Sequence, residues 1–311
     1  ICFIGIPCIT AYNVLASIFR GMGDSQSPMY FIAAACVVNI GLDFFFMGAL
    51  RLGPAGAALG TTLSQAVSVL LALCVILKRR SIRLSKSDFC PRKATMKDIL
   101  SIGLPVAAQD GFIQVSFMLI TIMANQRGLT DAAAVGIVEK IISFLFLVPS
   151  SMLSTVSALG AQNIGAGKYD RVDKILRYAI AIGVGFGAVM ALLMQFIAPS
   201  MVRPFTSDEA VVKAGAAYIR SYIFDCLFAG IQFSFSGYFC AWGRSGLSFL
   251  HNTLSILLVR VPGAWLACRF FPQTLVPMGL APACGSLFSS IVCILLYRWM
   301  KRQNKPTGDK D

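Results

Sequence analysis

The stretch Pro54-Ala-Gly-Ala-Ala-Leu-Gly60 opens a long apolar run that ends at the basic residue Lys78. Pro277-Met-Gly-Leu-Ala281 repeats its Pro-x-Gly-x-Ala opening 223 residues later. Lys301 closes the second run at the same offset from Lys78. The chain therefore contains two versions of one apolar helix, and this repeat predicts two related halves of one helical bundle.

A second pair of motifs lies upstream of these helices and supports the repeat. Phe19-Arg-Gly-Met-Gly23 corresponds to Phe239-Cys-Ala-Trp-Gly243 at an offset of 220 residues. If each half contains six spans, an even number, the two copies run in the same direction through the membrane. Such parallel repeats, related by an axis along the membrane normal, are typical of transporters with a cavity between two lobes.

The composition identifies an integral membrane protein. Hydrophobic residues make up 57% of the 311 residues and charged residues only 13%, whereas a soluble domain carries about 25% charge. Apolar runs of about 20 residues, enough to cross a bilayer core of about 30 Å, recur along the chain. We expect an all-α polytopic bundle with nine spans, at residues 1–19, 29–50, 55–77, 99–124, 132–158, 175–198, 221–242, 247–270 and 278–300.

The distribution of basic residues predicts the orientation of the chain. The loops after the first, third, fifth and seventh spans and the C-terminal tail carry seventeen Lys and Arg, and the opposite loops carry five. Because cytoplasmic loops are enriched in these residues, we expect a cytoplasmic C-terminus. The net charge of +13 is explained in the same way, without a nucleic-acid partner.

Ten cysteines without paired spacing indicate neither disulfides nor a zinc site.

These observations predict the domain organisation. Residues 1–80 form the remainder of an N-terminal lobe, 81–98 a cytoplasmic linker between lobes, 99–303 a C-terminal lobe and 304–311 a cytoplasmic tail. Because the first span is already under way at Ile1, we expect a chain that lacks three N-terminal helices.

Five motifs occur in the order in which multidrug and toxic compound extrusion (MATE) transporters carry them, and the chain resembles that family over nearly its whole length. The motifs are Arg20-Gly-Met-Gly-Asp-Ser-Gln-Ser-Pro28, Asn39-Ile-Gly-Leu-Asp43, Gly53-Pro-Ala-Gly-Ala-Ala-Leu-Gly-Thr61, Ile102-Gly-Leu-Pro105 and Gly160-Ala-Gln-Asn-Ile-Gly-Ala-Gly-Lys168. They resemble, in turn, the loop after helix four, helices five and six, the start of helix seven and the loop after helix eight.

The resemblance implies a MATE-like, two-lobe bundle of twelve helices, of which helices four to twelve are present. It implies a secondary antiporter that exports drugs or other toxic organic compounds, often cationic, in exchange for H⁺ or Na⁺. We expect a monomer in the plasma membrane, without enzymatic activity and without a cofactor beyond the coupling ion.

Acidic residues within spans are the main candidates for ion coupling, since a charge there costs about 2.5–3.5 kcal/mol and usually faces a cavity or a partner. Asp110 lies in mid-span with Gln109 and Gln114 nearby, and the three can line a cavity or ligate a cation. Asp225 is a second candidate. The alternatives are a hydrogen-bonded acid between helices for Asp110, and a hydrated acid or a partner of Arg220 for Asp225.

Four further polar residues belong to the candidate set. Asn39 and Asp43 share one helix face and form either a fixed polar contact between helices or a coupling site, the contact being the preferred interpretation. Glu139 faces a cavity if it points the same way as Ser143. Arg260 is the one deeply placed cation, and it either neutralises an acid or contacts anionic groups.

Other features are interpreted as structural. Gly56/Gly60 and Gly183/Gly187 have the spacing of close helix contacts. His251, the only histidine, cannot form a metal site alone, and a satisfied polar contact is preferred over a proton relay.

Three rival functions are weaker explanations of the sequence. The main one is a flippase for lipids or lipid-linked oligosaccharides with the same broad fold, which needs cationic clusters for phosphates. An intramembrane enzyme needs a convergent catalytic set that the sequence lacks, and a channel does not explain the tandem repeat.

Overall fold

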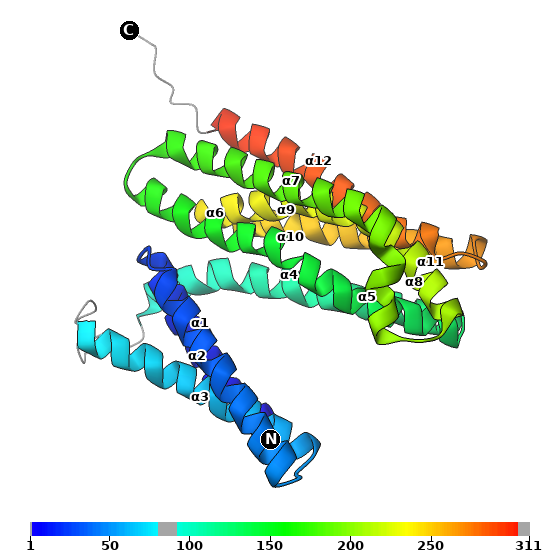
Figure 1. Cartoon of the computed structure of the whole chain (residues 1–311). Helices are drawn as coiled ribbons and strands as arrows, with labels where there is room; N and C mark the ends of the chain where they lie inside the picture. Colours follow the sequence, from blue (N-terminus) through cyan, green and yellow to red (C-terminus); the bar gives the residue numbers. More distant parts are fainter. Residues whose placement is uncertain (1, 80–91, 304–311) are drawn as a thin grey trace. The chain divides into compact units, whose positions relative to one another are not determined.

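The computed structural model describes residues 2–79 and 92–303, and the regular secondary structure in these ranges is helical (Figure 1). Nine helical segments in the described ranges are long and apolar enough to cross a membrane. The predicted all-α fold with nine spans is confirmed. The chain divides into two compact units, Ile1–Arg92 and Lys93–Asp311.

The N-terminal unit contains three spans: α1 (Cys2–Gly21), α2 (Gln26–Asp43) continued by the π-helical segment η1 (Phe44–Ala49), and α3 (Pro54–Arg79). Helix α3 packs against both α1 and α2. A small core of mostly aromatic and aliphatic side chains holds the three together, including Tyr12, Phe19 and Phe31. The Tyr12 hydroxyl donates a hydrogen bond to the Pro28 carbonyl at 3.0 Å, which joins α1 to the start of α2.

The C-terminal unit contains six spans, some of which consist of several helical segments. Helix α9 lies at its centre and packs against α6, α7 and α12, while α10 packs against α4. The bounds are α4 (Lys93–Gln126), α5 (Leu129–Leu145), α6 (Leu147–Gly165), α7 (Tyr169–Val202), η3 (Arg203–Phe205), α8 (Glu209–Tyr222), α9 (Phe224–Ala241), α10 (Ser245–Ser255), the π-helical η4 (Ile256–Arg260), α11 (Val261–Phe270) and α12 (Val276–Gln303).

Several helices extend beyond the predicted spans. Helix α4 begins at Lys93, within the predicted linker, and Pro105 lies inside it rather than at its start. Polar residues 93–98 form helix because a helix can extend past the apolar core, and membrane helices tolerate an internal proline. Helix α6 likewise continues to Gly165, through most of the motif expected to form a loop. Residues 81–91 of the predicted linker and the predicted tail at 304–311 lie outside the described residues.

The turn after α1 and the turn after α9 have the same geometry, as the repeat predicts. Gly23 and Gly243 both have a positive φ, 88° and 67°, a conformation that favours glycine. Gly23 N–H donates to the Arg20 carbonyl at 3.0 Å, and Gly243 N–H donates to the Cys240 carbonyl at 2.9 Å. In each unit the next span contains a π-helical segment, η1 or η4. The two halves thus share local structure as well as sequence.

Helices α7 and α9 approach each other through glycines. A methyl group built on Gly183 would lie 2.8 Å from the Gly230 Cα, and one built on Gly187 would lie 2.6 Å from the Leu227 Cα. The interpretation of Gly183 and Gly187 as a close helix contact is therefore confirmed. In the N-terminal unit Gly60 leaves room for the side chain of Asp43 in the same way.

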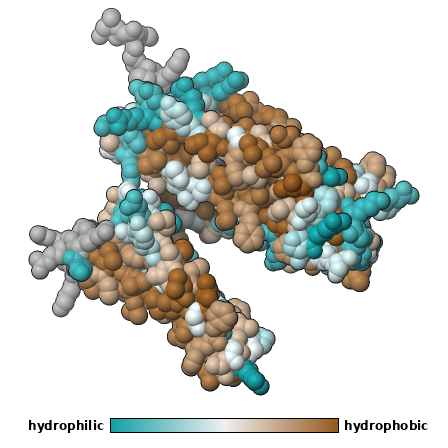
Figure 2. Space-filling model, viewed as in Figure 1, coloured by the Kyte–Doolittle hydropathy of each residue, from teal (hydrophilic) through white to brown (hydrophobic). Residues whose placement is uncertain are grey.

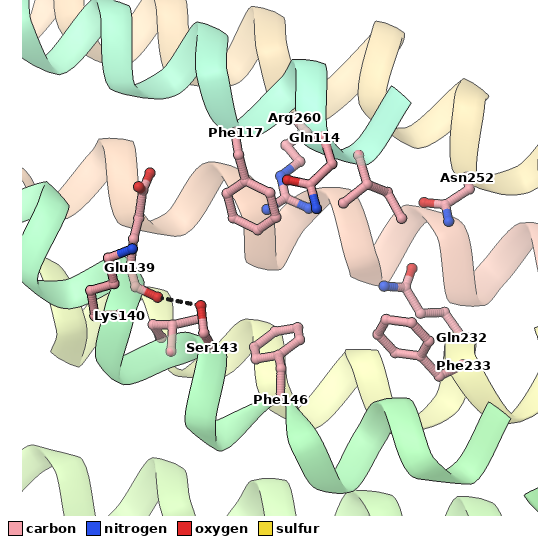
Figure 3. Close-up of a pocket in the computed structure, with 12 residues that line it drawn as sticks. Gln114, Phe117, Glu139, Lys140, Ser143, Phe146, Gln232, Phe233, Asn252 and Arg260 are labelled. Carbon is pink, nitrogen blue, oxygen red and sulfur yellow. Dashed lines mark hydrogen bonds between the residues drawn. The ribbon is translucent and has the colours of Figure 1, made fainter. Parts of the chain in front are cut away.

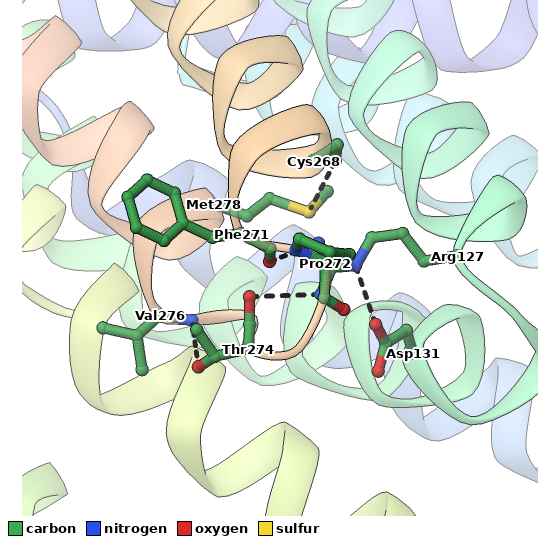
Figure 4. Close-up of polar contacts among 8 residues, drawn as sticks. All are labelled: Arg127, Asp131, Cys268, Phe271, Pro272, Thr274, Val276 and Met278. Carbon is green, nitrogen blue, oxygen red and sulfur yellow. Dashed lines mark hydrogen bonds and ion pairs between the residues drawn. The ribbon is translucent and has the colours of Figure 1, made fainter.

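Arg127 joins two turns at one end of the C-terminal unit (Figure 4). Its Nε donates to the Asp131 carboxylate at 2.7 Å, and its terminal nitrogens donate to the carbonyls of Phe271, Pro272 and Thr274 at 2.9–3.1 Å. The Arg127 side chain is only 6% exposed. The residue fixes the α4–α5 turn to the α11–α12 connection, so these two helix pairs are held together at this end.

Apolar side chains cover much of the visible surface of the helices, and hydrophilic residues gather near the helix ends (Figure 2). Exposed large hydrophobic residues include Tyr178, Val189, Leu192 and Phe196 along α7. A soluble domain does not expose apolar surface on this scale. This surface is consistent with lipid contact along the spans.

Candidate functional site

A pocket of about 380 Å³ opens into the C-terminal unit between α4, α5, α9, α10 and η4 (Figure 3). Its wall combines the rings of Phe117, Phe146 and Phe233 with charged and amide side chains. Its lining residues are Ile113, Gln114, Phe117, Glu139, Lys140, Ile142, Ser143, Phe146, Gln232, Phe233, Asn252 and Arg260. Apolar walls with a few convergent polar groups are the usual character of small-molecule sites.

Arg260 is placed in this pocket by the π-helical segment η4. Pro262 follows two residues later and has no N–H to donate back along the helix, which favours a local departure from α-helical bonding. The Arg260 side chain is buried, its Nη2 donates to the Tyr222 hydroxyl at 2.9 Å, and its guanidinium carbon lies 4.6 Å from the centre of the Phe117 ring. Its Nε is buried and has no hydrogen-bond partner among the described residues.

Glu139 provides the acidic group of the pocket. It lies on α5, is half-buried, and its carboxylate accepts a hydrogen bond from the Thr121 hydroxyl of α4 at 3.1 Å. Ser143, one turn further along α5, also lines the pocket and donates to the Glu139 carbonyl at 2.7 Å (Figure 3). Glu139 and Ser143 thus line the same cavity, as expected if they point the same way.

Asp225 lies in the first turn of α9 and is completely buried. Neither carboxylate oxygen has a hydrogen-bond partner in the described part of the chain, although Ser286 is a polar neighbour. The charge of Arg260 acts on Asp225, but no ion pair within 4.0 Å joins them in the described ranges. The alternative of a hydrated acid near the surface is wrong because Asp225 has no exposed area.

Gln109, Asp110 and Gln114 on α4 have different surroundings in the structure. Gln109 is buried and accepts a hydrogen bond from Ser248 at 2.7 Å, Gln114 lines the pocket, and Asp110 is exposed and does not line it. Adjacent residues on a helix point about 100° apart, so Gln109 and Asp110 face different surroundings. Of the three, Gln114 alone lines this described pocket, and the coupling role of Asp110 stays a prediction.

Asn39 and Asp43 lie together on α2 in the N-terminal unit. The Asn39 Nδ2 and the Asp43 Oδ1 are buried beside Gly60 and have no hydrogen-bond partner in the described residues. In the described part of the N-terminal unit, these two atoms make no hydrogen bond of the expected polar contact between helices. Because buried polar groups are normally paired, these two atoms remain candidates for a functional role.

Sequence reasoning missed several contributors to the site. Thr121 and Tyr222 hold the charged groups but look like ordinary polar residues in apolar helices. Phe233 also lines the pocket, although its sequence context does not distinguish it from the other apolar side chains of its span. The preferred interpretation of His251 as a satisfied polar contact is confirmed. Its ring nitrogens lie 3.0 and 2.7 Å from the hydroxyls of Ser236 and Ser289.

The sequence resembles curated multidrug resistance proteins. A "Probable multidrug resistance protein YpnP" of Bacillus subtilis (strain 168) is 30% identical over 300 residues, covering 96% of this chain and 66% of that protein. The "Multidrug export protein MepA" of Staphylococcus aureus (strain NCTC 8325 / PS 47) is 26% identical over 247 residues, covering 78% of this chain and 54% of that protein. The chain thus spans about half to two thirds of the length of these relatives.

Solved structures show the same fold. A crystallised variant of the Vibrio cholerae MATE transporter VcmN has a TM-score of 0.88 and 18% identity, covering 94% of this chain and 66% of that chain. An outward-facing multidrug resistance MATE family transporter of the MOP superfamily has a TM-score of 0.88 and 21% identity, with the same coverage. The family model described as MatE matches residues 105–266, more than half of the chain. The chain therefore belongs to the MatE family.

Proposed function

We propose that the full-length protein is a secondary antiporter that exports amphipathic organic molecules across the plasma membrane in exchange for H⁺ or Na⁺. The observation that carries this proposal is the pocket in the C-terminal unit, where aromatic rings, Glu139 and Arg260 meet within the membrane-spanning helices. Relatives named for multidrug resistance and export support the same function. We further propose that the C-terminus is cytoplasmic, in line with the charge distribution of the loops, and that the protein acts as a monomer.

We assign ion coupling to acidic side chains whose charge a bound H⁺ or Na⁺ can neutralise. Glu139 faces the pocket, whereas Asp225 is buried without a hydrogen-bond partner in the described structure. A carboxyl in such surroundings is protonated, or it needs a cation nearby, because an isolated charge in an apolar interior is too costly. An entering H⁺ or Na⁺ would therefore change the charge balance around Arg260.

The change in charge around Arg260 takes place where the helices are already interrupted. Asp225 follows the break between α8 and α9 at Ile223, and Arg260 closes the π-helical η4. Neutralising Asp225 removes its attraction for Arg260, and we expect the segments around both residues to repack. Each elementary charge moving down 100 mV supplies about 2.3 kcal/mol, which can drive such a change and the uphill export of substrate.

A flippase for lipids or lipid-linked oligosaccharides is the rival function. Its substrates carry phosphates, which require clustered cations. The pocket brings together two cations, Arg260 and Lys140, and Lys140 is exposed. This small set favours an exporter of single organic molecules over a carrier of large phosphorylated lipids.

Protection of a cysteine placed in the pocket tests the proposal. We expect Ser143→Cys in the full-length protein to gain thiol labelling over the wild type, and saturating dansyl-aminohexanoate or its trimethylammonium analogue to slow that labelling. Ser143 lies in the pocket wall, and a bound molecule covers it. The measurement is the labelling rate in nanodiscs.

Ser150→Cys on α6 is the matched control, because Ser150 is exposed and does not line the pocket. Protection of Ser143→Cys alone supports the pocket as the substrate site. Equal labelling rates with and without both probes at Ser143→Cys would overturn it.

A further inference from the structure

We propose that Arg260 forms a subsite for an anionic oxygen group of the substrate, so that the pocket prefers amphipathic molecules with a carboxylate over cations of the same size. The inference deepens the proposed function, since it rests on the pocket being the substrate site. It also differs from the expectation of mainly cationic substrates. Arg260 thereby acts as a specificity-determining residue.

Arg260 has hydrogen-bonding capacity that the described residues do not fill. A guanidinium has five N–H donors and stays charged at any physiological pH. Among the described residues the acceptor of a hydrogen bond from Arg260 is the Tyr222 hydroxyl at 2.9 Å, and the Nε is buried without a partner. The residue is only 9% exposed, so bulk water does not freely complete its shell. A ligand oxygen in the pocket would supply the missing acceptor.

The neighbouring acids do not accept these hydrogen bonds from Arg260. Asp225 and Glu139 act on Arg260 through their charge, yet neither lies within 4.0 Å of it in the described structure. The Glu139 carboxylate accepts the Thr121 hydroxyl instead. The charge of Arg260 is therefore balanced at a distance, while its donors remain available for an oxygen that arrives in the pocket.

The pocket wall around the guanidinium combines aromatic and polar side chains. Arg260 lies over the ring of Phe117, which holds the plane of the guanidinium beside an apolar surface. Gln114 and Asn252 add amide donors to the lining. Lys140 adds a second cation, and Glu139 is the one acid among the described lining residues. The labelled side chains surround a common space with Arg260 and Gln114 on one side (Figure 3). This combination suits an aromatic body with a terminal carboxylate.

Equilibrium binding of three dansyl probes to the full-length protein tests the inference. The probes share one body and end in a carboxylate, a carboxamide or a trimethylammonium group. In phosphatidylcholine nanodiscs without ion gradients, we expect the carboxylate to bind at least about tenfold more tightly than the ammonium probe, or ~1.4 kcal/mol. The carboxamide should lie between them because it offers an acceptor oxygen without charge.

Substitution of Arg260 should remove this preference. We expect Arg260→Gln to bring the carboxylate-to-ammonium affinity ratio to about one or below, and Arg260→Lys to retain part of it because a charge remains. The ratio is measured within each variant, so partial loss of folded protein cancels. Arg269→Gln is the control, since Arg269 is an exposed cation of α11 that lies over Trp265 outside the pocket.

An anionic lipid headgroup offers the same oxygen chemistry, and phosphatidylglycerol in the nanodiscs distinguishes the two sources. If this lipid competes with the carboxylate probe in the wild type but not in Arg260→Gln, the subsite also accepts lipid. A wild-type preference for the ammonium probe, or an unchanged ratio in Arg260→Gln, would overturn the inference. Ser143→Cys protection by the ammonium probe would still support the proposed function, so the two can fail separately.

Discussion

Asp225→Asn is expected to reduce gradient-driven export by at least about tenfold while the protein still reaches the membrane and binds the dansyl probes. The substitution keeps the volume of the side chain and removes the charge that a coupling cation neutralises. Tenfold corresponds to ~1.4 kcal/mol, within the 1–3 kcal/mol typical of coupling between two sites. The effect follows from the position of Asp225, which is fully buried, lacks a hydrogen-bond partner in the described ranges and lies in the field of Arg260.

The measurement is uphill export from cells or vesicles, compared with passive probe binding to the same preparation. Glu209→Gln is the matched control, because Glu209 is an acid at the start of α8 with a side chain that is 76% exposed. Unchanged export by Asp225→Asn at normal expression would exclude Asp225 from coupling. If Asp110→Asn loses export instead, the coupling acid lies on α4, as the sequence analysis proposed.

Gly187→Val is expected to destabilise the helix bundle by about 3 kcal/mol, near the upper end of the usual cost of overpacking. The added side chain would meet the backbone of Leu227 on α9, and its first carbon alone would lie 2.6 Å from the Leu227 Cα. Backbone atoms cannot rotate away as a side chain can. The two helices must separate, which also disturbs the packing of Gly183 against Gly230.

Thermal unfolding in detergent measures this effect. A loss of about 3 kcal/mol corresponds to a midpoint lower by roughly 5 °C, because the unfolding entropy is about 2.1 cal/mol/K per residue over a chain of this length. Gly185→Val makes the same change two residues earlier on α7, where an added Cβ meets nothing within 4 Å, and should leave the midpoint nearly unchanged. Equal midpoints for the two variants would contradict the close α7–α9 contact.

The nine spans could be predicted because hydrophobic length alone determines which segments can cross a bilayer. The turns at Gly23 and Gly243 could be predicted because a repeated glycine marks a repeated left-handed residue. The start of α4 at Lys93 could not, because its polar first turns carry no hydropathy signal. Helix ends beyond the apolar core depend on local contacts that a hydropathy pattern does not contain.

The candidate site was less predictable than the fold. Mid-span charges identified Glu139, Asp225 and Arg260 as residues that need an explanation, but the sequence did not show that η4 brings Arg260 to Tyr222. The position of Asp110 depends on a rotation of about 100° between neighbours, which separates it from Gln109. Pairings of this kind depend on tertiary packing, so they become visible only in the folded structure.

Transport by the purified full-length protein in proteoliposomes tests the central claim most directly. The substrate is a dansyl probe that protects Ser143→Cys, and the pH gradient and the Na⁺ gradient are imposed one at a time. We predict that one of the two gradients drives accumulation of the probe against its own concentration gradient, without a nucleotide. Equal movement with and without either gradient, or no movement at all, would contradict a cation-coupled antiporter.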